Sequence, residues 1–174
     1  MERQVPGRPV SVRPAVEADR SWIVQLLVER WGSTRVVSRG RLHAPDLLPA
    51  LVATGTQGER LGLVTYRLEG DQLEVVTLDA SVPQCGIGSA LLESAVSLAR
   101  SEGCRRLWLV TSNDNLDAVR FYQRRGLRLV AVHPGAIDRA RQTKPQVPGV
   151  GHFGIEVHDE VELAIELGWA RGNR

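Results

Sequence analysis

The chain has 174 residues, of which 43% are hydrophobic and 24% charged, proportions typical of a globular protein with one packed domain. A formal net charge of +2 argues against a nucleic-acid-binding protein, because such proteins usually carry a strong basic field. No apolar run approaches the roughly 18 residues that cross a bilayer, and the cysteines and histidines lack metal-type spacing. We therefore expect a cytoplasmic protein with no membrane partner, no disulfide framework and no metal.

The first half of the chain predicts a strand, a helix and a three-strand meander. Residues 10–13 alternate as a short strand does. Residues 16–31 carry one apolar helical stripe, and Gly32 suits the end of that helix. Residues 33–46 show no clear period and predict a loop with a helical turn. Three antiparallel strands are then expected at residues 50–54, 61–68 and 73–79.

The second half alternates helices with strands. The predicted elements are helix 88–102, strand 106–111, helix 115–125, strand 127–132, short helix 136–142 and strand 161–167. In the last strand apolar residues alternate with Glu162 and Glu166, which we expect to face water.

A strand-helix-strand crossover demands a parallel pair of strands beside the antiparallel ones. The predicted fold class is therefore α/β (α+β), with a mixed, mostly antiparallel sheet of six to seven strands, one parallel pair and helices on both faces. It forms a single domain over residues 10–168, between an N-terminal tail at 1–9 and a C-terminal tail at 169–174.

The stretch VPQCGIGSALLE places Gly86 and Gly88 directly before a helix. The start of a helix exposes unpaired N–H groups and a partial positive charge, and glycines let phosphate oxygens come close to the backbone. Residues 84–89 would supply those N–H groups. This pattern predicts an anion site for a phosphate group.

The residues alone disfavour two known phosphate-binding loops and leave open whether this loop binds a phosphate at all. The dinucleotide fingerprint needs a third glycine where Leu91 stands, and no Gly-Lys-Ser/Thr follows for an ATP-type loop. A tight strand-helix connection that binds nothing would also fit.

A second motif lies about thirty residues downstream. Asn115, Ala118, Tyr122 and Gly126 match Asn-x-x-Ala-x-x-x-Tyr-x-x-x-Gly, so that the chain resembles the GNAT superfamily of acetyl-coenzyme-A-dependent N-acetyltransferases. The resemblance covers residues 10–167 and is firmest over 73–132. One departure is Pro83, which stands where the family usually has Gln or Arg and which has no N–H to donate.

The resemblance implies that acetyl-coenzyme A (acetyl-CoA) is the co-substrate. Its pantetheine arm would lie in a splay between strands 73–79 and 106–111, with main-chain contacts to Leu78 and Ala80, and Asn115 would contact the pantetheine or order the loop. The pyrophosphate would lie on the glycine loop, against Gln84, Cys85, Gly86, Ile87, Gly88, Ser89 and Ala90.

The resemblance also implies the chemistry. An amine attacks the thioester directly in a ternary complex, and Tyr122 protonates the leaving thiolate, for which a phenol of pKa near 10 is suited. Glu74 is a candidate general base, against the alternative of a solvated carboxylate paired with an arginine. His133, Asp79 and an ordered water chain are further candidates.

The acceptor is expected to be a small-molecule or protein amine, recognised by residues 133–158, and a homodimer is the family's common habit. Two other classes compete with this interpretation. One is a non-catalytic acyl-CoA-binding sensor or scaffold, and the other is a nucleotide-binding domain unrelated to coenzyme A.

Overall fold

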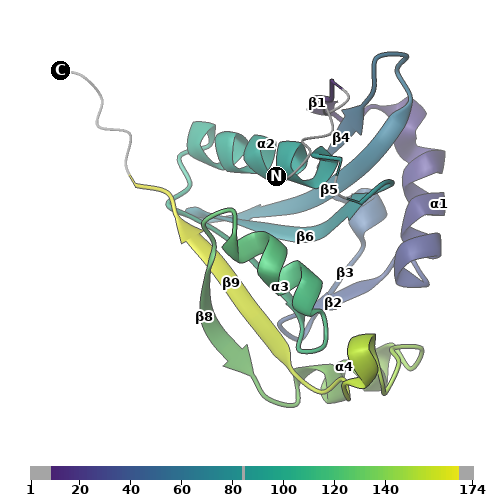
Figure 1. The fold of residues 1–174 in the computed structure, drawn as a ribbon, viewed down its shortest axis with the longest axis vertical. Helices are drawn as coiled ribbons and strands as arrows, with labels where there is room; N and C mark the ends of the chain where they lie inside the picture. Colours follow the sequence, from purple (N-terminus) through teal and green to yellow (C-terminus); the bar gives the residue numbers. More distant parts are fainter. Residues whose placement is uncertain (1–8, 84, 169–174) are drawn as a thin grey trace, which may run out of the picture.

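A seven-stranded sheet runs through the protein (Figure 1). The computed structural model describes residues 9–83 and 85–168. In spatial order the strands are β1 (Ser11–Pro14), β4 (Ala50–Thr54), β5 (Arg60–Glu69), β6 (Gln72–Ala80), β7 (Arg106–Ser112), β9 (Glu160–Glu166) and β8 (Arg128–His133). Only β6 and β7 pair in parallel among these strands, and every other neighbouring pair is antiparallel. The predicted mixed sheet is therefore confirmed.

Alternate residues of each strand point to opposite sides of the sheet, so that both faces carry apolar side chains. Helices cover both of these faces. Helix α1 (Arg20–Trp31) packs on the face that carries Ala50 and Val52 of β4. Helices α2 (Ile87–Ser101) and α3 (Leu116–Gln123) pack on the opposite face, which carries Leu51 and Ala53. Helix α4 (Ala136–Thr143) follows β8. Within the described residues, no helix has the length and apolar character needed to span a membrane.

The prediction of a loop at residues 33–46 was wrong. This segment forms a β-hairpin of β2 (Val36–Ser38) and β3 (Arg41–His43), followed by a 3-10 turn at Pro45–Leu47. Its two turn residues, Arg39 and Gly40, both have positive φ, which is the backbone of the primed turns that suit two-residue hairpins. Strands of three residues are too short to show a period, and an arginine at positive φ is not a usual turn signal.

The expectation that Glu162 faces water was also wrong, whereas Glu166 is exposed as predicted. Glu162 is buried and accepts hydrogen bonds from Arg39 Nη1 at 2.6 Å and Arg106 Nη2 at 2.7 Å, while His133 Nε2 lies 2.7 Å from its Oε2. The turn of the β2–β3 hairpin brings Arg39 to this glutamate. Alternation within one strand cannot show that a segment 123 residues earlier in the chain covers its polar face.

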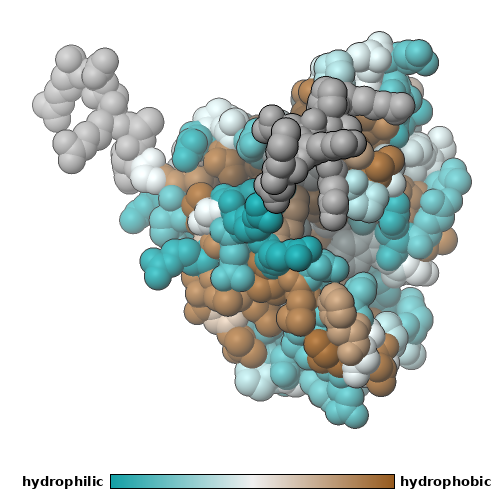
Figure 2. All heavy atoms as spheres, in the orientation of Figure 1, coloured by the Kyte–Doolittle hydropathy of each residue, from teal (hydrophilic) through white to brown (hydrophobic). Residues whose placement is uncertain are grey.

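Strand β8 forms one edge of the sheet and exposes apolar side chains at Leu129, Val130 and Val132. Figure 2 shows apolar surface in the region where Figure 1 places β8 and α3. A register shift between Leu129 and Ala131 explains why neighbouring residues are exposed together. None of these three side chains lines the cavities described below.

Candidate functional site

The parallel strands β6 and β7 separate soon after they meet. Their ladder pairs only Gln72–Glu74 with 106–108, although β6 continues to Ala80 and β7 to Ser112. At the point of separation, Val76 is an extra residue in the pairing with β5, and such a β-bulge bends its strand. The structure thus has the splay between these two strands that the resemblance implies.

A cavity of about 270 Å³ occupies this splay, and we call it the thioester cavity because the resemblance implies that the thioester of acetyl-CoA would lie here. Its walls come from both separated strands, from the end of α1 and from α3. The lining residues are Arg30, Trp31, Val75, Val76, Leu78, Asp79, Leu109, Val110, Thr111, Asn115, Ala118 and Tyr122. Of the predicted site residues, Leu78, Asn115 and Tyr122 therefore meet here, whereas Ala80 does not line the cavity.

Tyr122 is buried in the core, and its hydroxyl has no hydrogen-bond partner among the described residues. Burial raises the pKa of Tyr122 well above its ordinary value, and the charge of Asp79 adds to this effect. The phenol therefore keeps its proton throughout the neutral pH range. It can therefore donate a hydrogen bond to a group in the thioester cavity.

Asp79 lies on the same cavity wall. Its Oδ2 accepts a hydrogen bond from Trp31 Nε1 at 2.8 Å. Burial raises the pKa of the Asp79 carboxyl, and the Trp31 hydrogen bond opposes that rise in part. Trp31 gave no functional signal in the sequence, because it stands on the apolar helix α1 forty-eight residues before its partner.

Asn115 stands at the start of α3, where its Oδ1 accepts the N–H of Ala118 at 3.3 Å. This is an N-cap, which satisfies one of the free donors of a helix start. The motif asparagine therefore fixes the beginning of the helix that carries Tyr122. It also lines the thioester cavity and the larger cavity beside it.

The two glycines before α2 differ in their environments. Gly86 has a φ of 78°, and a Cβ built on it meets nothing within 4 Å, so that the backbone is open here. Gly88 is buried, and a Cβ there would lie 3.1 Å from Cζ of Phe121 on α3. No side chain of the described residues caps this helix start. Gly86 thus leaves the helix start accessible, while Gly88 lets α3 pack closely.

Four other predicted loop residues complete this segment. Cys85 is exposed, Ile87 is buried, and Ser89 and Ala90 are half-buried in the first turn of α2. Gln84 lies outside the described residues.

Arg125 is a residue of this site that sequence reasoning missed. Its Nε and Nη2 donate to Ser89 Oγ at 2.8 and 2.6 Å, and its guanidinium stacks 3.7 Å from the ring centroid of Phe121. A fixed guanidinium beside a helix start adds to the attraction of that position for an anion. The pair Arg124-Arg125 before Gly126 was the available signal, but only the packing of α3 on α2 shows which arginine faces the loop.

Glu74 is not brought to Tyr122. It is buried on the other face of β6, where Ser38 Oγ donates to it at 2.6 Å, Arg67 Nε at 3.4 Å, and His43 Nε2 lies 3.6 Å away. It lines none of the three cavities. The alternative interpretation was a solvated carboxylate paired with an arginine. Glu74 is paired with Arg67, but it is buried and not solvated.

A larger cavity of about 720 Å³ adjoins the thioester cavity. The two share walls at Arg30, Trp31, Val76, Val110, Thr111 and Asn115. Helix α4 and residues 144–157 close the other side of the larger cavity. Two buried carboxylates, Asp114 and Glu160, stand in its wall.

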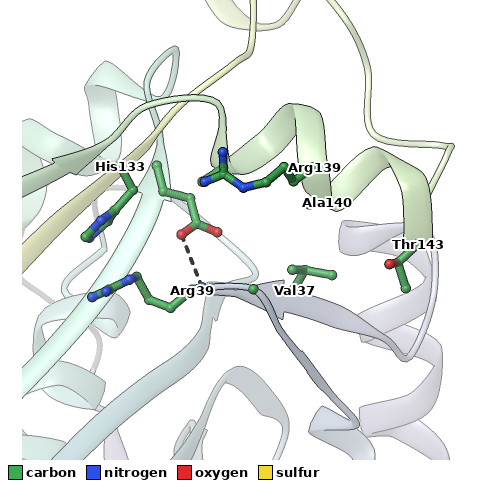
Figure 3. Close-up of a pocket in the computed structure, with 9 residues that line it drawn as sticks. Val37, Arg39, His133, Arg139, Ala140 and Thr143 are labelled. Carbon is green, nitrogen blue, oxygen red and sulfur yellow. Dashed lines mark hydrogen bonds between the residues drawn. The ribbon is translucent and has the colours of Figure 1, made fainter.

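A third cavity, of about 410 Å³, continues from the larger one, with which it shares Val37, Ala140 and Glu160. Figure 3 shows Arg39 and His133 on one side of it and Arg139 of α4 on the other. Arg39 and His133 are both engaged with Glu162. Three adjoining cavities therefore lead from Tyr122 to the surface between the β2–β3 hairpin and α4.

Comparisons with known proteins agree with this architecture. The sequence profile of the Acetyltransferase (GNAT) family matches residues 20–127. The chain is 34% identical to the uncharacterized protein YdhI of Bacillus subtilis (strain 168) over 148 residues, which cover 85% of this chain and 92% of that protein.

Two solved structures are similar in fold. An IAA acetyltransferase from Bacillus cereus ATCC 14579 has a TM-score of 0.66 at 20% identity, over 91% of this chain and 100% of that one. A GNAT family acetyltransferase from Elizabethkingia anophelis with acetyl-CoA bound has a TM-score of 0.64 at 16% identity, over 91% and 98% of the two chains. Since the family profile matches more than half of the sequence, the chain belongs to the GNAT family of acetyltransferases.

Proposed function

We propose that the protein is an N-acetyltransferase that moves the acetyl group of acetyl-CoA to a primary amine by direct attack in a ternary complex. The observation that carries the proposal is the thioester cavity, which lies between two separated parallel strands with the unpartnered Tyr122 hydroxyl in its wall. A solved GNAT structure with acetyl-CoA bound shares this fold.

The acetyl-CoA site is proposed at the start of α2 and along β6. The open backbone at Gly86 and the guanidinium of Arg125 favour the pyrophosphate there. Leu78 and Ala80 stand on the part of β6 that no longer pairs with β7, so that their main chain is free to pair with the pantetheine amides. The remaining proposed contacts are Gln84, Cys85, Ile87, Gly88, Ser89, Ala90 and Asn115.

Tyr122 is proposed as the group that stabilises the departing thiolate. Bound acetyl-CoA supplies an activated acyl carbonyl whose sulfur must leave. A phenol with a raised pKa is protonated at neutral pH and donates a hydrogen bond to a thiolate whose own pKa is about 8.5. Because the phenol is the weaker acid, complete transfer of its proton is uphill, and the ammonium of the attacking amine is the final source of the proton.

Asp79 is the favoured candidate for the base that removes this amine proton. It lines the thioester cavity with Tyr122, whereas Glu74 lies on the opposite face of β6 and His133 lines the third cavity. A carboxylate with a raised pKa is also a better proton acceptor than an ordinary one. The role of Glu74 as the general base stays a prediction that only kinetics can test. The cytoplasmic location and the homodimer also stay predictions.

Replacing Asp79→Asn is expected to lower turnover about 100-fold at neutral pH, within the usual range for loss of a general base. Wild-type turnover should rise with pH through the pKa of Asp79, which lies above the ordinary carboxyl value, and Asp79→Asn should lack this rise. Turnover against pH is the measurement, and Asp117→Asn, an exposed aspartate on α3, is the matched control.

Thermal unfolding separates this role from a structural one. A carboxyl whose pKa is raised in the folded state costs stability at pH values above that pKa, so that Asp79→Asn should melt no lower than wild type at pH 7. A variant that keeps its turnover, or that loses turnover and melting temperature together, would argue against the base.

The proposed function is tested by free-thiol release from acetyl-CoA in the presence of a panel of primary amines, together with calorimetric binding of acetyl-CoA. We expect binding and amine-dependent thiol release. Binding without release for any amine would favour the non-catalytic sensor or scaffold. Absence of binding, with NAD or ATP bound instead, would favour a nucleotide-binding domain.

A further inference from the structure

Glu160 differs from most of the other buried carboxylates of the described chain in lacking a cationic partner. Asp19, Glu74 and Glu162 each lie within 4 Å of an arginine nitrogen. Glu160 is 1% exposed, yet no side-chain nitrogen of an arginine, lysine or histidine among the described residues lies within that distance of its carboxylate. A buried charge is costly unless it is paired, and burial accordingly raises the pKa of Glu160, so that a cation supplied by a ligand would stabilise its charged form.

The contacts of Glu160 leave one of its oxygens available. Its Oε2 accepts the backbone N–H of Arg39 at 3.1 Å, the bond drawn as a dashed line in Figure 3. Its Oε1 has no hydrogen-bond partner among the described residues. The side chain stands where the larger cavity meets the third one. The charged groups around it include Arg39 and His133, both engaged with Glu162, Arg139, whose Nη1 donates to the carbonyl of Pro134 at 3.2 Å, and Glu74, whose negative charge raises the pKa of Glu160 further.

Asp114 is a second carboxylate in the wall of the same cavity, and it stands next to Asn115, which also lines the thioester cavity. Its Oδ2 accepts the N–H of His152 at 2.8 Å and lies 2.9 Å from His152 Nδ1. Its Oδ1 is buried and has no partner in the described chain that meets hydrogen-bond geometry. Burial alone would raise its pKa, but the neighbouring Ser112 hydroxyl and the His152 donors lower it, so that Asp114 stays charged.

The cations in the walls of the larger cavity do not neutralise these oxygens. Lys144 Nζ donates to the carbonyls of Trp31 and Arg35, at 2.8 and 2.9 Å, and so ties the end of α4 to the end of α1. Arg30 is exposed at the rim. Among the charged groups in the wall of this cavity, the two carboxylates therefore have no arginine or lysine partner, and an ammonium group is a donor that matches them.

We infer that the acceptor is a diamine or longer oligoamine, which presents one amine to the thioester cavity past Asp114 while Glu160 holds a second ammonium. This inference rests on the proposed function for the reaction, but the binding of the diamine does not depend on turnover. The apolar walls between the two carboxylates, which include Val37, Val76 and Val110, suit the methylene chain that joins two such amines.

The test compares 1,6-diaminohexane with n-hexylamine, which has the same chain but a single amine. We expect wild type to acetylate the diamine with a kcat/KM at least tenfold higher, mainly through a lower KM. In Glu160→Gln the preference should fall to about twofold or less. Glu166→Gln, which changes an exposed glutamate on the same strand and face, should keep the wild-type preference.

Calorimetric binding of 1,6-diaminohexane to wild type and to Glu160→Gln gives a second readout, with thermal melting to show that the variants are folded. Equal kcat/KM for the two amines, or a preference that survives both Glu160→Gln and Asp114→Asn, would overturn the inference while leaving the acetyltransferase intact. Diamine binding that depends on Glu160, in a protein that releases no thiol, would support the site and count against the proposed reaction.

Discussion

Turnover is expected to fall about 100-fold in Tyr122→Phe, while the affinity for acetyl-CoA stays within about twofold of wild type. The substitution removes one oxygen from a buried ring and leaves its packing against Phe121, so that the fold and the cofactor site are kept. The lost hydroxyl is the donor that stabilises the departing thiolate. A 100-fold loss corresponds to about 2.7 kcal/mol of transition-state stabilisation.

Steady-state kinetics and calorimetry with acetyl-CoA measure the two effects separately. The matched control is Tyr66→Phe, because Tyr66 is the other tyrosine of the chain and packs against the same core without lining the thioester cavity. Tyr66→Phe should keep turnover within about threefold of wild type. If both variants turn over like wild type, Tyr122 is a core residue and its proposed role is wrong.

The second large effect is expected at the glycine loop, where Gly86→Val should weaken acetyl-CoA binding at least tenfold. Gly86 has a positive φ, a conformation that β-branched residues rarely adopt, and the added side chain would occupy the open space at the helix start. The backbone N–H groups of the first turn would then no longer meet the pyrophosphate. Calorimetric titration with acetyl-CoA measures the change.

Backbone strain alone must be separated from loss of the site. Gly58, in the turn between β4 and β5, has the same φ of 78° and equally open surroundings. Gly58→Val should therefore show a similar loss of thermal stability but wild-type binding of acetyl-CoA. The loop assignment would have to be abandoned if the two variants bound acetyl-CoA equally well.

The strands and helices with a clear period were predictable from the sequence. Helix α2 and the strands β5 to β7 lie within two residues of their expected limits, because each is long enough for its apolar pattern to show. The β2–β3 hairpin was not predictable in this way, since its strands have three residues each and its turn contains Arg39. That hairpin lines the larger cavity and the third cavity, where we propose that the acceptor amine binds. The sequence therefore indicated the proposed acetyl-CoA site far better than the proposed amine site.

The candidate site also contains residues that were predictable from the sequence and residues that were not. Gly86, Asn115 and Tyr122 belong to local motifs, and a local motif can be read along one segment. The contact between Trp31 and Asp79 joins residues 48 positions apart, and Glu160 acquires its environment from elements that start more than 100 positions earlier. Which carboxylates are buried without a cation depends on such distant pairings and cannot be inferred from strand alternation.

The tie between Lys144 and helix α1 has a consequence for the chemical resistance of the protein. Lys144 is the single lysine of the chain, since every other strongly basic side chain is an arginine, which is no nucleophile at neutral pH. Its amine is buried and donates to two carbonyl oxygens. This single lysine amine is therefore protected from accidental acylation by a thioester such as acetyl-CoA.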